Sequence, residues 1–172
     1  EAGKSLHDEL AKLPTTRFDL VTVTDRPTSL KTRFRSGSQQ ILRVDDEVTS
    51  YINAAAAEQF SKYALPAIQD ADLVVLSDYA KGALPLMLLE KIIAYAKSKG
   101  KMIIVDPKRA DISVYSGVDL LTPNLAELQN TTDQILSSIE EIGEAATTLA
   151  KEFGIGSILT TMSARGIMLS KA

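Results

Sequence analysis

The sequence has no cysteine and no tryptophan, and His7 is its single histidine. Without cysteine the chain can form no disulfide bond or thiolate metal site, and one histidine is too few for a histidine-based zinc site. For the same reason a Ser-His-Asp catalytic set is not expected. Aromatic residues are few, five tyrosines and four phenylalanines, so stacking surfaces for bases or sugars are poorly supplied. Recognition of a ligand must therefore rest on hydrogen bonds and charge.

An excess of positive charge is also missing, because 24% of the residues are charged and the formal net charge is -3. Nucleic acid is therefore not expected as a partner. No apolar run approaches the roughly 18 residues that suggest a membrane span, and the N-terminus lacks the pattern of a signal peptide. Neither a Walker A pattern nor a glycine-rich Rossmann fingerprint occurs. We expect a soluble, cytoplasmic protein that does not act at a membrane.

The elements that are present alternate between strand and helix in the second half of the chain. With 172 residues, 45% of them apolar, the chain is long enough for one domain with a core. Alternating elements predict right-handed crossovers and an α/β fold with a mostly parallel sheet. The expected strands are 73–77, 102–105, 120–121, 158–161 and 166–170, and the expected helices are 85–98, a short one from 124 and a longer one over 135–153.

The first half of the chain does not show this alternation, and its pattern predicts a helix, a β-rich run and a hairpin. The helix is expected over 1–13, the β-rich run covers 18–24, and a second helix is expected over 53–69. Between them, two alternating segments around Ser36-Gly37-Ser38 predict a hairpin within 28–45. The alternation places Lys31, Arg33 and Arg35 on one face, which is either a solvated surface or, together with Arg43, a phosphate-binding lid.

Polar clusters follow three successive strands of the predicted sheet, at 77–82, 106–109 and 122–127. In an open parallel sheet, ligands bind beyond the carboxyl ends of the strands, so these clusters should converge on one crevice. Asp78 and Asp106 come directly after apolar strands, from which they would point into that crevice. The alternative is a salt-bridged surface turn that contains Asp78 and Lys81. The clusters indicate a site for a charged small molecule.

The last of these clusters contains Asn124 and Glu127, three residues apart at the start of an expected helix. This spacing is typical of a capping box, which needs no ligand. The same two oxygen-bearing side chains are suited to hydrated Mg²⁺ beside a polyphosphate, because Mg²⁺ binds through one or two carboxylates and phosphate oxygens. The two interpretations are compatible with each other. A further segment, 160–166, carries hydroxyls and a glycine and is a weaker signal.

Taken in order, four segments resemble the ribokinase-like, or phosphofructokinase B type, family of sugar kinases. They are the hairpin 28–47, the loop Asp78–Gly82, the turn Asp106-Pro107-Lys108 and the motif Asn124–Glu127. The resemblance covers essentially the whole chain. Within the family, Gln39-Gln40 of the hairpin and the loop Asp78–Gly82 point to the heptose 7-phosphate kinase branch.

This resemblance implies a ribokinase-like α/β fold with a β-hairpin lid that also forms a homodimer. It implies ATP-dependent phosphorylation of D-glycero-D-manno-heptose 7-phosphate at the anomeric hydroxyl, toward ADP-heptose and lipopolysaccharide core, with ATP and Mg²⁺. The residues implied at the ATP site are Asn124 and Glu127, also near Mg²⁺, with Thr161, Ser163 and Gly166. Those expected around the phosphosugar and phosphates are Lys31, Arg33, Arg43, Asp78, Lys81 and Lys108.

The chain departs from the family pattern in lacking a Gly-Ala-Gly-Asp stretch, whose backbone N–H groups bind the transferred phosphate and whose aspartate is the catalytic base. The glycine- and asparagine-rich sugar-binding segment is missing as well. We therefore expect the central part of one kinase domain, with a lid at about 17–47, an α/β core at about 53–172 and no catalytic residue, inactive alone. The alternatives are a noncatalytic module that binds a nucleotide or phosphosugar, and a kinase for another sugar.

Overall fold

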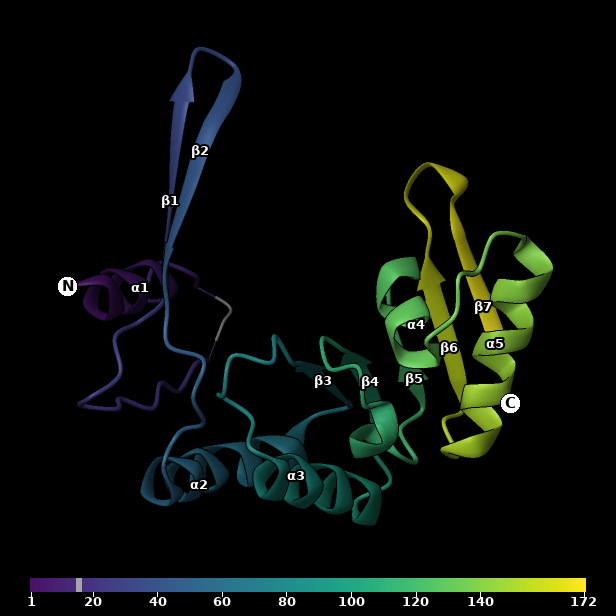
Figure 1. Ribbon diagram of the computed structural model, residues 1–172. Helices are drawn as coiled ribbons and strands as arrows, with labels where there is room; N and C mark the ends of the chain where they lie inside the picture. The colour runs from purple at the N-terminus through teal and green to yellow at the C-terminus, as the bar shows by residue number, and fades with distance from the viewer. Residues whose placement is uncertain (15–16) are drawn as a thin grey trace.

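The computed structural model describes residues 1–14 and 17–172 (Figure 1). The helices are α1 (Ala2–Leu10), α2 (Ala54–Asp70), α3 (Leu86–Ser98), α4 (Leu125–Thr132) and α5 (Ile139–Glu152), with short 3₁₀ turns η1 (Ile112–Tyr115) and η2 (Ser163–Arg165). The strands are β1 (Leu30–Ser36), β2 (Gln39–Asp46), β3 (Leu73–Ser77), β4 (Met102–Asp106), β5 (Leu120–Leu121), β6 (Ser157–Thr161) and β7 (Ile167–Lys171). Within the described residues, none of these helices has the length and apolar character needed to span a membrane.

The five C-terminal strands form one sheet in the order β3-β4-β5-β6-β7. Strands β3 to β6 run parallel, and β7 folds back antiparallel on β6. Helices α3 and α5 connect successive parallel strands, while β5 and β6 are also separated by α4. The expected α/β fold with a mostly parallel sheet is thereby confirmed.

One face of this sheet is packed into the core. The register pairs Val74 with Ile103 and Leu121 with Ile158, so these side chains share a face, and all four are buried. They join one apolar cluster with residues of every helix from α2 to α5, among them Ile68, Leu89, Leu128 and Ile142. Burying such side chains contributes about 1.5–3 kcal/mol each, which makes this face the main source of stability.

The opposite face of the sheet is apolar but exposed. Leu73 and Val75 on β3, Met102 on β4, and Ile167 and Leu169 on β7 all point away from the core cluster and lie open. Strand β3 is also an edge, since within the described residues it pairs only with β4. An open edge beside an exposed apolar face is the kind of surface that promotes association between chains.

Strands β1 and β2 form a separate antiparallel hairpin that projects from the rest of the molecule (Figure 1). Its turn contains Gly37, whose φ of 58° is readily adopted by glycine. The register places Phe34 opposite Leu42 and Arg33 opposite Arg43, so one face is apolar and the other is charged. The predicted hairpin and its charged face are confirmed.

Three expected details are wrong. The helix expected over 135–153 begins only at Ile139, because Ser138 caps it, and Ile135 lies outside the core at 88% exposure. The first helix ends at Leu10 rather than at Leu13. The β-rich run 18–24 forms no strand, since a strand needs a partner and this run has none among the described residues.

The exposed sheet face predicts that the 172-residue chain associates with itself when it is studied alone. Val75, 61% exposed on edge strand β3, belongs to this face. The variant Val75→Lys should weaken association by about tenfold, because it places a charge on the edge and removes apolar surface. Sedimentation velocity at several concentrations measures the effect. The matched control is Met87→Lys, at an apolar residue 79% exposed on α3, and a wild-type chain that stays monomeric would contradict the prediction.

Candidate functional site

The carboxyl ends of the parallel strands meet at one edge of the sheet. The amide of Asp78, just after β3, donates to the carbonyl of Asp106 on β4 at 3.0 Å. The amide of Thr122 donates to the carbonyl of Val105 at 2.9 Å, and Asn124 forms a bridge with Thr161 at the end of β6. The strand ends therefore lie side by side, and the expectation that their side chains line one crevice stays a prediction.

Asp78 lies at the centre of a buried polar network. Its side chain is 3% exposed, and its Oδ2 atom accepts from Arg109 Nε at 2.6 Å and from the Tyr115 hydroxyl at 2.9 Å. Its Oδ1 atom accepts from the amide of Ala80 at 2.9 Å. Arg109 also donates to the carbonyl of Leu84 and, at 3.2 Å, to the hydroxyl of Tyr51. Both oxygens of Asp78 thus have partners inside the protein, and the expected role of Asp78 in substrate binding stays a prediction.

The network also changes the acidity of Tyr115, which is fully buried. Burial raises the pKa of the Tyr115 phenol well above its usual value of 10.0, and the hydrogen bond to Asp78 raises it further. The phenol therefore stays protonated and remains a hydrogen-bond donor to the carboxylate. The ion pair and this neutral donor together satisfy a charge that would otherwise be costly to bury.

The N-terminus of α4 carries the capping box that its sequence predicts. Asn124 Oδ1 accepts from the amide of Glu127 at 2.9 Å, and Glu127 Oε2 accepts from the amide of Asn124 at 2.8 Å. The second oxygen of Glu127 pairs with Lys108, from the loop after β4, and this contact raises the pKa of the Lys108 ammonium. The capping interpretation is confirmed, and the metal-binding interpretation stays a prediction.

A metal ion at this position would need ligands from outside the side chains. Among the described residues, no three His, Cys, Asp or Glu side chains gather into a metal-binding group. One carboxylate and one amide oxygen nevertheless fit the chemistry of Mg²⁺, which keeps several waters and takes further oxygens from phosphates.

An open groove of about 610 Å³ lies beside this helix start. Four of the five predicted ATP-site residues line it, namely Asn124, Thr161, Ser163 and Gly166. Leu125, Gln129 and Met162 contribute to the same wall. The backbone turns sharply around the groove, with φ of 54° at Ser163 and 90° at Gly166. Glu127 does not line the groove, because its carboxylate turns toward Lys108.

The base of the hairpin carries a second charged cluster, in which two carboxylates hold three cations. Asp45 pairs with Lys31 at 2.9 Å and with Arg43 at 3.0 Å. Glu47 pairs with Lys81 at 2.6 Å and with Lys31 at 3.3 Å. The hydrogen bond from Lys81 holds the pKa of Glu47 below its usual value. Three of the predicted substrate residues are thus brought together.

The structure does not bring this cluster next to the groove. The hairpin rises near the β3 edge of the sheet, whereas the groove lies by β6 and β7 at the other end (Figure 1). Arg33 is exposed opposite Arg43, and no carboxylate of the described chain lies within ion-pair distance of it. Facing like charges on neighbouring strands destabilise a hairpin slightly, so this pair of arginines is suited to an anion.

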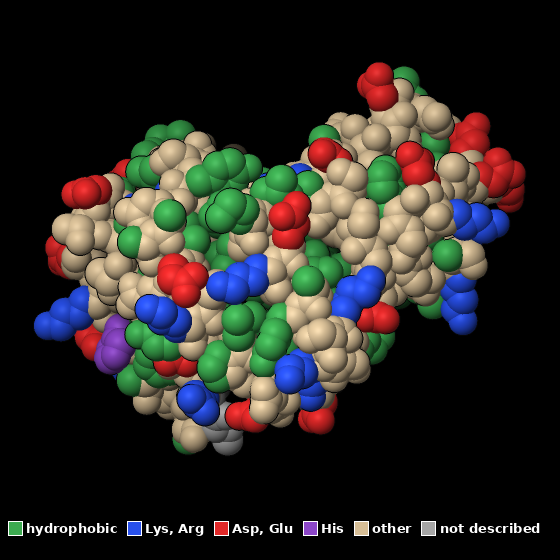
Figure 2. All heavy atoms as spheres, turned by 90° about the horizontal axis from the view of Figure 1, so that it is seen from below, with side chains coloured by type: hydrophobic (Ala, Val, Ile, Leu, Met, Phe, Trp, Pro, Cys, Tyr) green, Lys and Arg blue, Asp and Glu red, His purple; other side chains and the backbone are tan. Residues whose placement is uncertain are grey.

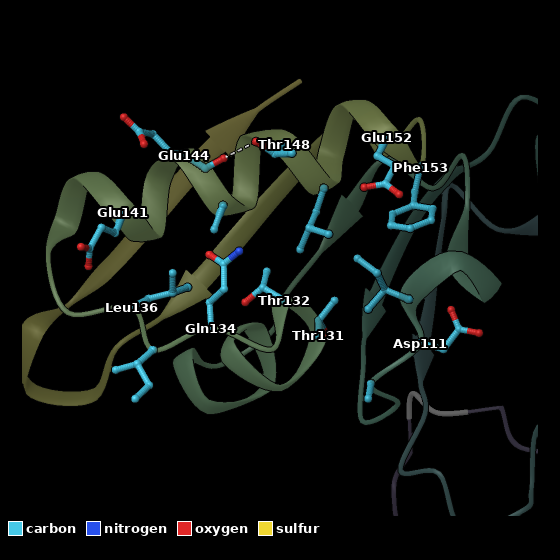
Figure 3. Close-up of a pocket in the computed structure, with 15 residues that line it drawn as sticks. Asp111, Thr131, Thr132, Gln134, Leu136, Glu141, Glu144, Thr148, Glu152 and Phe153 are labelled. Carbon is cyan, nitrogen blue, oxygen red and sulfur yellow. Dashed lines mark hydrogen bonds between the residues drawn. The ribbon is translucent and has the colours of Figure 1, made fainter.

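A different cavity, of about 620 Å³, lies between α4, α5 and the loop at Asp111 (Figure 3). Its charged lining is acidic, from Asp111, Glu141, Glu144 and Glu152. The Thr148 hydroxyl on this wall donates to the carbonyl of Glu144 at 2.8 Å. Since carboxylates repel phosphate, this cavity is unsuited to a nucleotide.

On the face shown in Figure 2, basic and acidic side chains are interspersed.

Three residues with central contacts, Arg109, Tyr115 and Arg26, were not predicted from the sequence. Arg109 lies in the cluster 106–109, whose sequence does not indicate that the guanidinium turns inward to Asp78. Tyr115 gave no signal because its partner is far away in the chain. Arg26 lies in an irregular segment, yet it donates to carbonyls of two other segments. An aspartate after a buried strand, followed by an arginine after the next strand, is the one pattern that could have suggested the Asp78–Arg109 pair.

Comparisons with known proteins identify the family of the chain. A family model described as pfkB family carbohydrate kinase matches residues 3–172. A curated relative from Azorhizobium caulinodans, "Bifunctional protein HldE", is 39% identical over 170 residues, which is 98% of this chain and 35% of the relative. The protein of that name from Helicobacter pylori is 38% identical over 148 residues, 86% of this chain and 32% of its own length. The chain thus spans about a third of these relatives.

Solved structures share the fold. The ribokinase of Giardia lamblia superposes with a TM-score of 0.78 at 16% identity, covering 100% of this chain and 56% of that one. Phosphofructokinase-2 from Escherichia coli, in complex with potassium, gives a TM-score of 0.67 at 18% identity over 86% of this chain and 48% of its own. The likeness confirms the ribokinase-like fold.

The buried phenol predicts a loss of stability at alkaline pH. The pKa of Tyr115 is higher in the folded state than in the unfolded state. The contribution of its protonated phenol to the free energy of unfolding is therefore fully present below about pH 10 and is lost as the pH rises above that value. The variant Tyr115→Phe should cost about 1 kcal/mol at neutral pH, through the lost hydrogen bond, and lack this part of the pH dependence. Urea unfolding from about pH 8 to about pH 11 should show the two proteins converging. Parallel curves would contradict the prediction.

Proposed function

Because the chain belongs to the pfkB family of carbohydrate kinases, we propose that it is part of an ATP-dependent heptose 7-phosphate kinase. The observation that carries this proposal is the 39% identity to the HldE relative over 98% of the chain, together with the heptose-branch motifs Gln39-Gln40 and Asp78–Gly82. The chain covers 35% of that relative, so the activity is proposed for the complete protein.

The reaction is transfer of the γ-phosphoryl group of ATP to the anomeric hydroxyl of D-glycero-D-manno-heptose 7-phosphate. The bond between the β,γ-bridging oxygen and the γ-phosphorus breaks, a bond from the hydroxyl oxygen to that phosphorus forms, and the hydroxyl proton goes to a base. The products are ADP and the 1,7-bisphosphate. Such catalysis depends on positioning and on stabilisation of the phosphoryl charge.

ATP is proposed to occupy the groove lined by Asn124, Thr161, Ser163 and Gly166. Its hydroxyl and backbone groups suit a ligand that is recognised by hydrogen bonds. Glu127 and Asn124 would hold Mg²⁺, which supplies charge neutralisation to the phosphates when bound. Lys108 lies beside Glu127, and we propose that it binds a phosphate there.

The phosphosugar is proposed to bind under the hairpin. Lys31, Arg43 and Lys81 already lie together at its base, and Arg33 is exposed opposite Arg43. A guanidinium offers two parallel donors to a phosphate, which favours the arginines as its direct ligands. Asp78 contributes from within, by fixing the loop that carries Lys81.

The catalytic base is not assigned to any of these residues. The sequence contains no Gly-Ala-Gly-Asp stretch, and the one buried carboxylate of this edge, Asp78, is already paired with Arg109. We therefore assign phosphoryl transfer to the complete protein and expect these 172 residues to be inactive alone.

A homodimer through the hairpin is part of the proposal. The apolar face of the hairpin, formed by Leu30, Phe34, Leu42 and Val44, is exposed, and a second copy could cover it with the same face. In the complete protein, Phe34→Asp should shift the sedimentation coefficient from dimer to monomer. A dimer unaffected by this change would exclude the hairpin as the interface.

The activity is tested with the complete protein, purified and supplied with Mg²⁺ and ATP. We expect ADP and the 1,7-bisphosphate from heptose 7-phosphate, and little product from ribose or fructose 6-phosphate. Product from another sugar alone would identify a different kinase. ATP or sugar binding without any product would support the noncatalytic module.

The role of Glu127 is tested by Glu127→Gln. Glutamine at this helix position preserves a capping box, so the fold should remain, while the lost charge should lower kcat/KM by about a hundredfold and raise the Mg²⁺ requirement. The chain offers a matched control, Glu141→Gln, at the same position of the α5 capping box. An unchanged Mg²⁺ dependence in Glu127→Gln would remove the residue from the metal site.

A further inference from the structure

The hairpin is held to the rest of the molecule at its base. Its strands project outward, and every residue of β1 is exposed (Figure 1). The chain returns from β2 to α2 through the segment 47–53, here called the stalk. The stalk runs beside the loop 78–84 that follows β3, here called the β3 loop. The direction of the hairpin therefore depends on how the stalk is fixed to the β3 loop.

Arg26 joins these two segments with one side chain. Its Nη1 atom donates to the carbonyl of Ser50 at 2.5 Å, and its Nη2 atom donates to the carbonyl of Val48 at 2.7 Å. The same Nη2 atom donates to the carbonyl of Lys81 in the β3 loop. Arg26 itself lies just before β1, so it connects both ends of the hairpin to the loop.

The stalk and the β3 loop are also in close backbone contact. The amide of Ile52 donates to the carbonyl of Gly82 at 3.0 Å. Gly82 has φ of 79°, and a Cβ atom added there would lie 2.0 Å from the carbonyl oxygen of Ser50. The backbones are thus too close for any side chain at this position. Arg109, held by Asp78, also donates to the hydroxyl of Tyr51 in the stalk.

We propose that Arg26 is a positioning residue that fixes the direction of the hairpin by clamping the stalk to the β3 loop. The effect of this clamp on substrate binding rests on the proposed kinase function, whereas the attachment of the hairpin does not. A planar guanidinium can reach three carbonyls in fixed directions, whereas an ammonium at the end of a lysine cannot match them all. Carbonyl partners also set Arg26 apart from Lys31, Arg43 and Lys81, whose partners are carboxylates.

The clamp is tested by hydrogen exchange of the complete protein with the variant Arg26→Met. Loss of hydrogen bonds from a charged donor should speed exchange of the Ile52 amide by about tenfold, while core amides such as Ile103 keep their protection. The matched control is Arg17→Met, at an exposed arginine of the same N-terminal region. Wild-type protection of Ile52 in Arg26→Met would overturn the proposal.

Kinetics give a second readout that a purely structural role would not produce. A displaced hairpin should raise KM for the sugar phosphate by about tenfold and leave KM for ATP near its wild-type value, since the groove lies at the far end of the sheet. Arg26→Lys should recover little of the loss. Equal changes in both KM values would overturn the proposal.

A variant that opens the clamp without touching Arg26 guards against misfolding. If Arg26→Met also loses core protection, Gly82→Ala takes its place, because its methyl group must push the stalk away from the β3 loop. It should reproduce the fast Ile52 exchange, and slow exchange there would overturn the clamp. A complete protein without kinase activity would contradict the proposed function. The exchange rate of the Ile52 amide would still test whether Arg26 clamps the stalk.

Discussion

The ion pair between Asp78 and Arg109 is the interaction on which the arrangement of the strand-end loops depends. Asp78 is 3% exposed, and removing one partner of such a buried pair costs about 3–5 kcal/mol, because the other charge is left uncompensated. The pair joins the loop after β3 to the loop after β4, and Arg109 extends the connection to Tyr51 near the hairpin. The loops after β3 and β4 and the base of the hairpin are therefore connected through one buried carboxylate.

Two neighbouring cations in one loop connect three strand ends, but with unequal strength. Arg109 turns inward to Asp78, while Lys108 turns to Glu127 at the start of α4. The Lys108 side chain is 44% exposed, whereas those of Arg109 and Asp78 are 13% and 3% exposed, and more exposed pairs contribute less. The Lys108–Glu127 contact can thus open to admit a phosphate or a metal ion without unfolding the site. The Asp78–Arg109 contact cannot open so cheaply, which suits it to a supporting role.

The sequence allowed the fold to be predicted wherever the signal is local. Strand and helix alternation gave the parallel sheet, and the spacing of Asn124 and Glu127 gave the capping box. The partner of Asp78 lies 31 positions away, so sequence could indicate a carboxylate at a strand end but not that it turns inward. The β propensity of 18–24 is local, whereas a strand also needs a neighbouring strand to pair with. The apolar spacing suggested a helix from Ile135, but the capping box at Ser138 starts the helix at Ile139. Thr161, Ser163 and Gly166 were predicted from the family resemblance and do line one groove. Arg26 was not predicted, because its contacts are to backbone carbonyls.

The charges at the hairpin base show how such a site can be stable before a ligand arrives. Lys31, Arg43 and Lys81 would repel one another, and Asp45 and Glu47 compensate them. The three cations are 40% to 51% exposed, while Asp45 and Glu47 are 22% and 16% exposed. A phosphate with two negative charges can therefore reach the cations and compete with the carboxylates for them. The carbonyl partners of Arg26 are not displaced in this exchange, since they accept hydrogen bonds but carry no net charge. The hairpin base can therefore exchange its ion pairs for substrate while its attachment to the β3 loop stays intact.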